Sequence, residues 1–205
     1  MGRLKEFDET KAIDGAVDCF WARGYEATSV RDLAEHMGIG GASLYNAYGG
    51  KRTLFVKALA RYADRSMRER IARLEGGSRP KEAIRAFLAE IIERSLADRD
   101  RKGCLLVNSA LDVAPHDAEI GAVVAGYLDE IRAFFQRNIE AGRRAGQMPR
   151  NLDAEAVSAH FLGVLMGIRV LVRTKPDRAL LESVARPALG LLDMPVKPRA
   201  RQGRS

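Results

Sequence analysis

Apolar residues recur three and four positions apart along almost the whole chain, and no stretch alternates apolar and polar residues as a strand would. The pattern predicts an all-α protein of about nine helices. Glycine, proline or a capping aspartate stands at most of the breaks between them. The predicted helices cover residues 11–23, 30–37, 41–48, 51–74, 80–98, 104–114, 118–142, 154–174 and 177–192.

The most informative stretch runs from residue 29 to residue 48, where two short helices are predicted on either side of a tight turn. Ala34 gives the first helix a small side chain where a second helix can cross it, and Gly38 can take the positive φ of the turn. Leu33 and Leu44 would contribute to a shared core. This pattern is typical of a helix-turn-helix, whose second helix enters the major groove of DNA. The simpler alternative is a helical hairpin with a glycine turn and no role in DNA binding.

The stretch from Gly24 to Leu59 resembles the DNA-binding domain of the TetR family of bacterial transcriptional regulators. The resemblance rests on Thr-Ser-Val-Arg-Asp-Leu-Ala at residues 28–34, Leu-Tyr-Asn-Ala-Tyr-Gly-Gly-Lys at 44–51 and Leu-Phe at 54–55. It implies a homodimer, usually a repressor, that binds a palindromic operator in double-stranded DNA. Release would follow when a small-molecule effector enters the C-terminal domain.

The chain carries 34 basic and 27 acidic residues, a net charge of +7, and four of the basic residues lie in its last 12 positions. Because so much of the excess is in the tail, the net charge alone says little about nucleic acid. On the TetR interpretation the chain has four parts. They are a helix-turn-helix domain at 1–50, a connecting helix at 51–75, a ligand-binding and dimerisation domain at 76–193 and a disordered basic tail at 194–205.

The resemblance implies that some residues of the first domain hold phosphates, which fix the register on the duplex, while others face the bases. Tyr45 could instead be a half-buried packing residue, and Arg31 could pair with Glu35, four residues on. The implied phosphate contacts are Tyr45, Lys51 and Thr28 or Ser29, the implied base contacts are Arg31, Ala42, Ser43 and Asn46, and Gly41 and Tyr48 complete the set.

The helices predicted between residues 80 and 174 are expected to enclose a cavity for a small apolar or amphipathic effector. Asn108 and Tyr127 would supply the polar groups that orient a ligand in such a site. The same residues are equally those of an ordinary helical core, and the resemblance alone suggests the cavity. The candidate lining residues are Phe87, Ile91, Leu105, Asn108, Leu111, Tyr127, Ile131, Phe134, Phe161 and Leu165.

The last two predicted helices are expected to form the dimer. Small residues recur every four positions along the first of them, which lets another helix approach closely, and the second carries more apolar residues than one protomer needs. Both helices could instead close the core of a monomer. The candidate interface residues are Ala159, Gly163, Gly167, Leu180, Leu181, Val184, Ala188 and Leu191.

The chain has two cysteines, Cys19 and Cys104, without the spacing of a zinc site or a disulfide framework. Cys104 follows the basic segment 99–103 at a predicted helix start, where cations and helix amides favour the reactive thiolate. This favours a second hypothesis, in which the same DNA-binding protein senses oxidants or electrophiles through Cys104. The plain alternative is a small packing residue.

Other functional classes lack their signatures. His36, His116 and His160 show no metal-ligand spacing, and no nucleophile elbow or phosphate-binding loop occurs, so we expect no enzyme, cofactor or metal. A helical carrier or enzyme without DNA binding is the alternative from another class. No stretch reads as a signal peptide or a membrane span, which predicts a cytoplasmic protein without a membrane partner.

Overall fold

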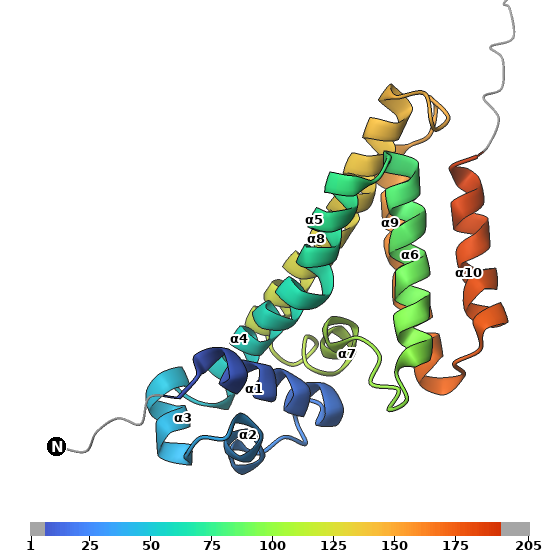
Figure 1. Cartoon of the computed structure of the whole chain (residues 1–205). Helices are drawn as coiled ribbons and strands as arrows, with labels where there is room; N and C mark the ends of the chain where they lie inside the picture. The colour runs from blue at the N-terminus through green and yellow to red at the C-terminus, as the bar shows by residue number, and fades with distance from the viewer. Residues whose placement is uncertain (1–6, 194–205) are drawn as a thin grey trace, which may run out of the picture.

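The computed structural model describes residues 7–193, and in this range the chain is helical without a strand (Figure 1). The predicted all-α fold is confirmed. Predictions for residues 1–6 and for the tail lie outside the described residues. The elements are α1 (Glu9–Arg23), α2 (Val30–Met37), α3 (Gly41–Tyr48), α4 (Lys51–Ala63), the π-helical η1 (Asp64–Arg68), α5 (Glu69–Gly77), α6 (Pro80–Ala97), α7 (Leu105–Asp112), α8 (Ala118–Arg144), α9 (Ala154–Thr174) and α10 (Arg178–Leu191).

The first three helices form a small unit at one end of the molecule (Figure 1). Its core is made by fully buried apolar side chains, and the Phe20 ring meets the Phe55 ring of α4 edge-on at 4.8 Å between centroids. Helix α1 crosses the end of α2 so closely that a Cβ built at Gly15 would lie 2.4 Å from the His36 carbonyl oxygen. Glycine at this position therefore allows the two helices to pack.

One long helix joins this unit to the rest of the molecule. Helices α4 and α5 are continuous through η1, where the Glu69 N–H donates to the Asp64 carbonyl oxygen five residues earlier. The helix runs beside α8, and Arg68 binds Glu130 of α8 at 2.5 Å (Figure 1). A helix was predicted here, but the π-turn within it was not.

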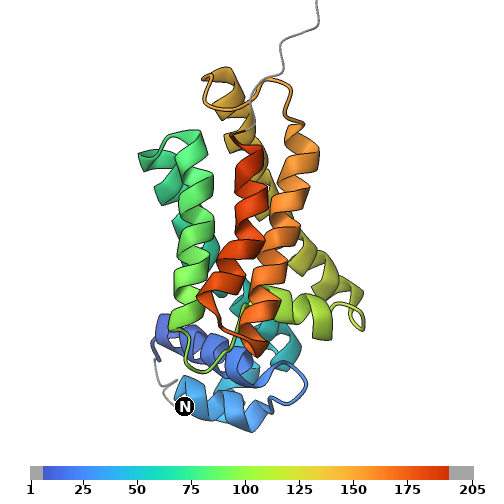
Figure 2. The ribbon, with the colours of Figure 1, turned by 90° about the vertical axis from the view of Figure 1, so that its right-hand side faces the viewer.

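The C-terminal body is a bundle of α6, α8, α9 and α10. Figure 2 shows α6 (green), α10 (red) and α9 (orange) next to one another. Four phenylalanines at its centre, Phe87, Phe134, Phe135 and Phe161, pack with centroid separations of 5.0 to 5.3 Å. Side chains of Asp117 and Asp153 accept backbone hydrogen bonds at the starts of α8 and α9, where the sequence analysis expects a capping aspartate.

Helix α7 connects the two halves. Leu105, Leu106 and Val107 belong to the same buried cluster as Phe20 and Leu54 of the N-terminal unit. The core of the first domain therefore continues across α7 into the start of α8.

Helix α9 is the most apolar long helix of the described chain. It is the only helix within residues 7–193 that is long and apolar enough, by length and composition, to cross a membrane. The sequence analysis found no membrane span, and α9 meets this test by length and composition alone. In the fold α9 packs against α8 and α10, and its Arg169 is buried against Ser95 of α6, so α9 is part of the helical bundle.

Candidate nucleic-acid interface

The turn between α2 and α3 has the geometry of a helix-turn-helix. Gly38 takes a left-handed φ of 67°, and the Ile39 N–H donates to the Ala34 carbonyl oxygen at 3.0 Å. Leu33 and Leu44 are fully buried beneath the turn. The inner face of α3 is held in the core by these contacts, and its outer face is left free.

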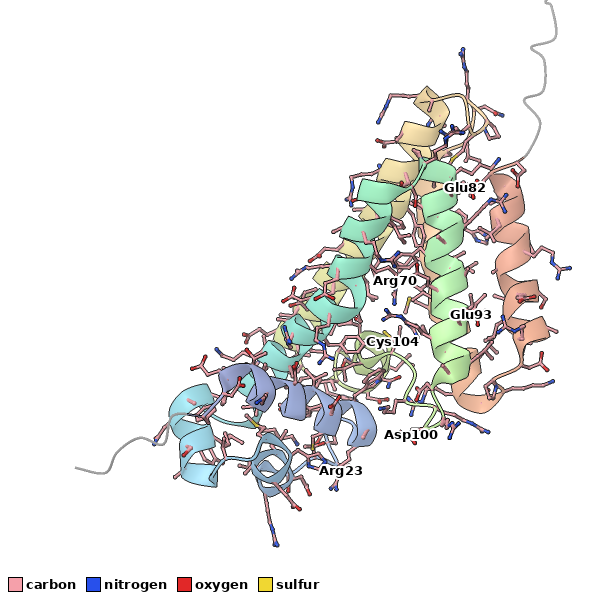
Figure 3. The ribbon with its side chains drawn as sticks, in the orientation of Figure 1. Arg23, Arg70, Glu82, Glu93, Asp100 and Cys104 are labelled. Atoms are coloured by element: carbon pink, nitrogen blue, oxygen red, sulfur yellow. The ribbon has the colours of Figure 1, made fainter. Side chains whose placement is uncertain are left out.

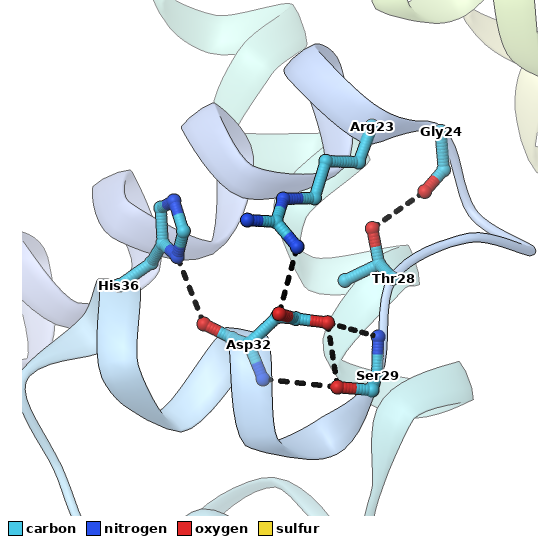
Figure 4. A network of polar contacts seen from close by, with 6 residues as sticks. All are labelled: Arg23, Gly24, Thr28, Ser29, Asp32 and His36. Atoms are coloured by element: carbon cyan, nitrogen blue, oxygen red, sulfur yellow. Dashed lines mark hydrogen bonds and ion pairs between the residues drawn. The ribbon is translucent and has the colours of Figure 1, made fainter.

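A polar network fixes the start of α2 (Figure 4). The Ser29 hydroxyl accepts from the Asp32 N–H at 3.1 Å, and the Asp32 carboxylate accepts from the Ser29 N–H at 2.9 Å and from its hydroxyl at 2.5 Å. Arg23 lies 2.7 Å from the same carboxylate. The hydrogen bonds from Ser29, followed by the charge of Arg23, hold the pKa of Asp32 below its usual value.

The network decides between the two predicted hydroxyl contacts. Thr28 is 1% exposed and its hydroxyl donates to the Gly24 carbonyl oxygen at 2.6 Å, so the side chain is not placed to donate to a phosphate. The prediction for Thr28 is corrected for this reason. Ser29 is exposed, and its predicted phosphate contact remains a prediction.

The outer face of α3 presents most of the predicted contact residues. Tyr45 is 56% exposed, which contradicts the alternative that it is a half-buried packing residue. Gly41, Ala42 and Asn46 are exposed, and Ser43 is half-buried beside them. The helix therefore offers short side chains and one amide to a groove.

Tyr48 lies on the opposite face and corrects a second expectation. It is 8% exposed, its ring centroid is 6.4 Å from that of Phe7, and its hydroxyl is buried without a hydrogen-bond partner among the described residues. Burial raises the pKa of this hydroxyl. Tyr48 is a core residue and does not contact DNA in this arrangement.

Two predicted cations lie near the ends of the motif. Lys51 begins α4, with Nζ 4.3 Å from the Tyr25 ring centroid and 3.5 Å from the Glu26 carbonyl oxygen. Arg31 is exposed, and within the described part of the chain it makes no ion pair with Glu35. Arg31 is therefore accessible to a polyanion, whereas Lys51 is half-buried at the start of α4.

Comparison with known proteins identifies the family. A family model for bacterial regulatory proteins of the tetR family matches residues 12–58, and one for a tetracyclin repressor-like C-terminal domain matches residues 80–188. The chain belongs to the TetR family. The two matches cover the helix-turn-helix and the C-terminal helical body separately.

Individual TetR regulators are similar over nearly their full length. The HTH-type transcriptional regulator YezE of Bacillus subtilis (strain 168) is 31% identical over 195 residues, which is 94% of this chain and 100% of the relative. The HTH-type transcriptional repressor ComR of Escherichia coli (strain K12) is 29% identical, with 93% and 91% covered. A cysteine mutant of the TetR family transcriptional regulator CifR, solved with 26-base-pair operator DNA, is 32% identical, with a TM-score of 0.82 and 92% and 98% covered.

The C-terminal domain of this TetR chain contains an internal cavity of about 30 Å³, between the connecting helix, α6, α7, α8 and α9. Of the predicted lining residues, Phe87, Ile91, Ile131 and Leu165 reach it. The residues that sequence reasoning missed come mainly from the connecting helix and α7. They are Tyr62, Ser66, Met67, Arg70, Cys104, Leu106, Val107, Leu128 and Arg169.

The remaining six predicted lining residues lie elsewhere. Leu111 is 57% exposed, and Leu105 faces the N-terminal core. Asn108 donates to the Lys102 carbonyl oxygen and accepts from Arg173. The prediction that these residues line the cavity is therefore corrected. The sequence predicted the helices but not which face of each helix is turned toward the cavity. Phe134 and Phe161 are in the aromatic core, and Tyr127 packs beside Arg68, with 5.2 Å between Cζ and the ring centroid.

Two arginines give the internal cavity its charge. Arg70 Nε lies 3.2 Å from the Glu90 carboxylate, and Arg169 Nη1 lies 3.0 Å from Ser95 Oγ. Burial lowers the pKa of Arg70 to about 10, with Arg94 and Arg169 acting in the same direction and Glu90 opposing them. An arginine inside an apolar stretch such as Gly-Ile-Arg-Val-Leu-Val at 167–172 was the available signal for Arg169.

The predicted dimer residues divide into two groups. Ala159 and Gly163 are exposed on α9, and Gly167, Leu180, Val184 and Leu191 are partly exposed. A Cβ built at Gly163 or Gly167 meets no atom within 4 Å. Leu181 and Ala188 are fully buried against their own protomer, so they are corrected to core residues.

Both cysteines are free and buried. Cys104 occupies the position before α7 and lines the internal cavity. Cys19 lies in the core of the N-terminal unit, where burial raises the pKa of its thiol. Cys104 therefore borders the internal cavity, whereas Cys19 is enclosed in the core of the N-terminal unit.

Proposed function

We propose that this chain is a cytoplasmic DNA-binding repressor that acts as a homodimer. Each protomer would place α3 in the major groove of one half of a palindromic operator, with Asn46 facing the bases and Tyr45 and Lys51 on the phosphates. The observation that carries the proposal is the exposed outer face of α3, held by a buried inner face within a helix-turn-helix. The operator complex of the similar CifR mutant supports it.

A gel-shift experiment with the DNA flanking the chain's own gene tests this proposal. We expect a specific complex whose affinity falls about 10³-fold or more between 50 and 200 mM salt, because a dimer would neutralise several phosphates. Footprinting should show two protected half-sites about 10 base pairs apart, centre to centre. No complex with these fragments at 50 mM salt would contradict the proposal.

The dimer would form through the exposed side of α9 together with the partly exposed residues of α10. The open space over Gly163 and Gly167 supports this assignment, because small residues let a second helix come close. Sedimentation at micromolar concentration should give twice the mass of one chain. A monomer would exclude two-fold recognition of a palindrome.

Release would be controlled from the C-terminal domain. The internal cavity supports a role in effector binding, because it touches the connecting helix, which is the covalent link to the DNA-binding unit. An effector that prefers a different tilt of this helix would change the spacing of the two α3 helices. Loss of operator binding when the effector is added is the expected result.

A second candidate is sensing through Cys104 by the same DNA-binding protein. The location of this thiol in the wall of the internal cavity favours it, since a small oxidant or electrophile that enters the cavity would meet the sulfur. The test is operator release by peroxide or a quinone. Cys104→Ser should abolish release and Cys19→Ser should not; unchanged release by Cys104→Ser would exclude the hypothesis.

A further inference from the structure

The charges around the internal cavity do not balance. Arg70 has a side chain that is 4% exposed, and Arg169 is also buried. The carboxylate that pairs with Arg70 is Glu90, which is shared with Arg73 at 2.6 Å. Two buried guanidinium groups therefore line one cavity, and the carboxylate that pairs with one of them is shared with the exposed Arg73.

Arg169 is the less satisfied of the two. In the part of the chain that the structure describes, its side chain makes one hydrogen bond, to the neutral hydroxyl of Ser95, and no ion pair. A guanidinium has five N–H donors, and a buried charge without a counter-charge is costly. The site is therefore short of an anion.

The rest of the wall is largely apolar. Phe87, Ile91 and Leu165 line the cavity, and the Phe87 ring centroid lies 5.5 Å from the Arg70 guanidinium carbon. The volume of about 30 Å³ is room for about two water molecules, which is close to what the two oxygens of a carboxylate occupy. Figure 3 shows Arg70 and Cys104 between the connecting helix and α6.

We propose that the internal cavity binds the carboxylate of a small amphipathic organic acid between Arg70 and Arg169. The forked guanidinium groups match a carboxylate, and Phe87, Ile91 and Leu165 accept the apolar part of the acid. Calling this acid the effector rests on the proposed function; its binding does not.

The cavity must widen to admit more than the carboxylate. Tyr62 and Ser66 line both this cavity and a second hollow of about 150 Å³, which is bounded on its other sides by residues that include Trp21 and Arg94. Movement of these two shared side chains would join the two spaces. The second hollow is therefore the route by which an acid would enter.

The test uses the full-length protein with hexanoate, octanoate and benzoate, each compared with its neutral amide. Binding is measured as a shift in Tm and by the fluorescence of Trp21, the chain's single tryptophan, whose ring lies 5.2 Å from that of Tyr62. We expect at least one acid to raise Tm by several degrees and to bind at least tenfold more tightly than its amide. No response to any acid, or an equal response to acid and amide, would overturn the proposal.

Variants identify the site. Arg169→Met and Arg70→Met should each weaken binding of the acid at least tenfold, and methionine is chosen because apolar replacements of buried charges are often tolerated by the fold. Arg169→Lys, which keeps the charge without the fork, covers the case in which a methionine variant does not fold. Arg173→Met is the matched control, because Arg173 is exposed one turn along the same helix. Undiminished binding by a folded Arg169 variant would refute the assignment.

Gel shifts on the same samples separate this inference from the proposed function. Operator binding with no response of Tm to acids would remove only the carboxylate site. Acid binding by a protein that binds no operator would remove only the repressor.

Discussion

Asn46 is the exposed amide on the outer face of α3, among small neighbours. An amide can make a bidentate contact with adenine, whereas a tyrosine hydroxyl on a phosphate carries no sequence information. Asn46→Ala should therefore cost about 1 to 3 kcal/mol of discrimination at one base pair. Tyr45→Ala should weaken binding to operator and random DNA alike. Competition binding with operator variants distinguishes the two outcomes, and equal losses for both substitutions would contradict the assigned roles.

Ser29 gives a stability prediction for the same domain. Ser29→Ala removes the hydroxyl that accepts from the Asp32 N–H at the start of α2, and it should lower the free energy of unfolding by about 1 kcal/mol. Urea denaturation measures the change. Ser183→Ala is the control, because its exposed hydroxyl donates to a carbonyl within α10 without capping a helix. An equal change in both variants would show that the cap is not responsible.

At the residue scale, spacing predicted which helix is presented but not always which way a side chain points. Tyr45 and Tyr48 are three residues apart and were both assigned to DNA, yet one is exposed and the other buried. Thr28 and Ser29 are adjacent hydroxyl residues, and one is sealed by its bond to Gly24. The outcome for Tyr48 depends on a partner distant in sequence, Phe7, and the outcome for Thr28 on a loop carbonyl whose direction the sequence does not give.

At the scale of elements, η1 stands out because it has contacts on two sides. Its Ser66 and Met67 line the internal cavity, and Arg65 binds Asp14 of α1 at 2.9 Å. Arg61, just before it, binds the same carboxylate at 2.7 Å and is the first cause of the lowered pKa of Asp14. π-turns are frequent at functional sites. We expect a change in the cavity wall to reach α1 through these ion pairs.

Asp14→Asn tests this coupling. Exposed ion pairs contribute about 0.2 to 1 kcal/mol each, so loss of two should reduce the effect of bound acid on operator affinity by about 2-fold and at most about 30-fold. Fluorescence anisotropy with labelled operator, with and without octanoate, gives that ratio. Asp129→Asn, which disturbs an ion pair within α8, should leave it unchanged. A ratio equal to wild type in Asp14→Asn would exclude this link.

Helix boundaries could be predicted because caps and breaking residues are local signals. Asp117 and Asp153 begin helices as expected. The π-turn has no such signal, because Asp-Arg-Ser-Met-Arg at 64–68 is compatible with an ordinary helix. Arg169 was likewise missed, since the sequence alone does not say that its helix turns this residue toward Ser95.

For the whole molecule, the contact between α4 and α8 gives a pH prediction. Arg52 binds Asp117 through two hydrogen bonds, of 2.8 and 3.0 Å. This pairing is the largest cause of the lowered pKa of Asp117, which is about 2. The folded-state pKa is depressed, so the contribution to stability is complete above the ordinary value near 3.8 and is lost as pH falls through about 2. As the pH falls from about 3.8 to about 2, the denaturation midpoint should therefore decrease less in Asp117→Asn than in the wild type. Asparagine is chosen because it keeps a side chain that can cap α8. Identical pH profiles would contradict the pairing.

Gly163→Leu tests the assembly. The protomer has space for the new side chain, and helix propensity favours leucine, so Tm of the monomer should not fall. Close approach of a second α9 should be blocked, giving a monomer in sedimentation and a large loss of operator affinity. Gly126→Leu is the matched control on α8, where a Cβ also meets nothing within 4 Å. A dimeric Gly163→Leu variant would place the interface elsewhere.

The buried cluster that joins α1, α4, α7 and the start of α8 has a practical consequence for building hybrid regulators. A chimera that grafts residues 7–77 onto a foreign sensor would strip Phe20 and Leu54 of the Leu105–Val107 neighbours that share their cluster. Such a graft should expose apolar surface and aggregate. Chimeras that include α7 and the first turns of α8 together with residues 7–77 should remain soluble.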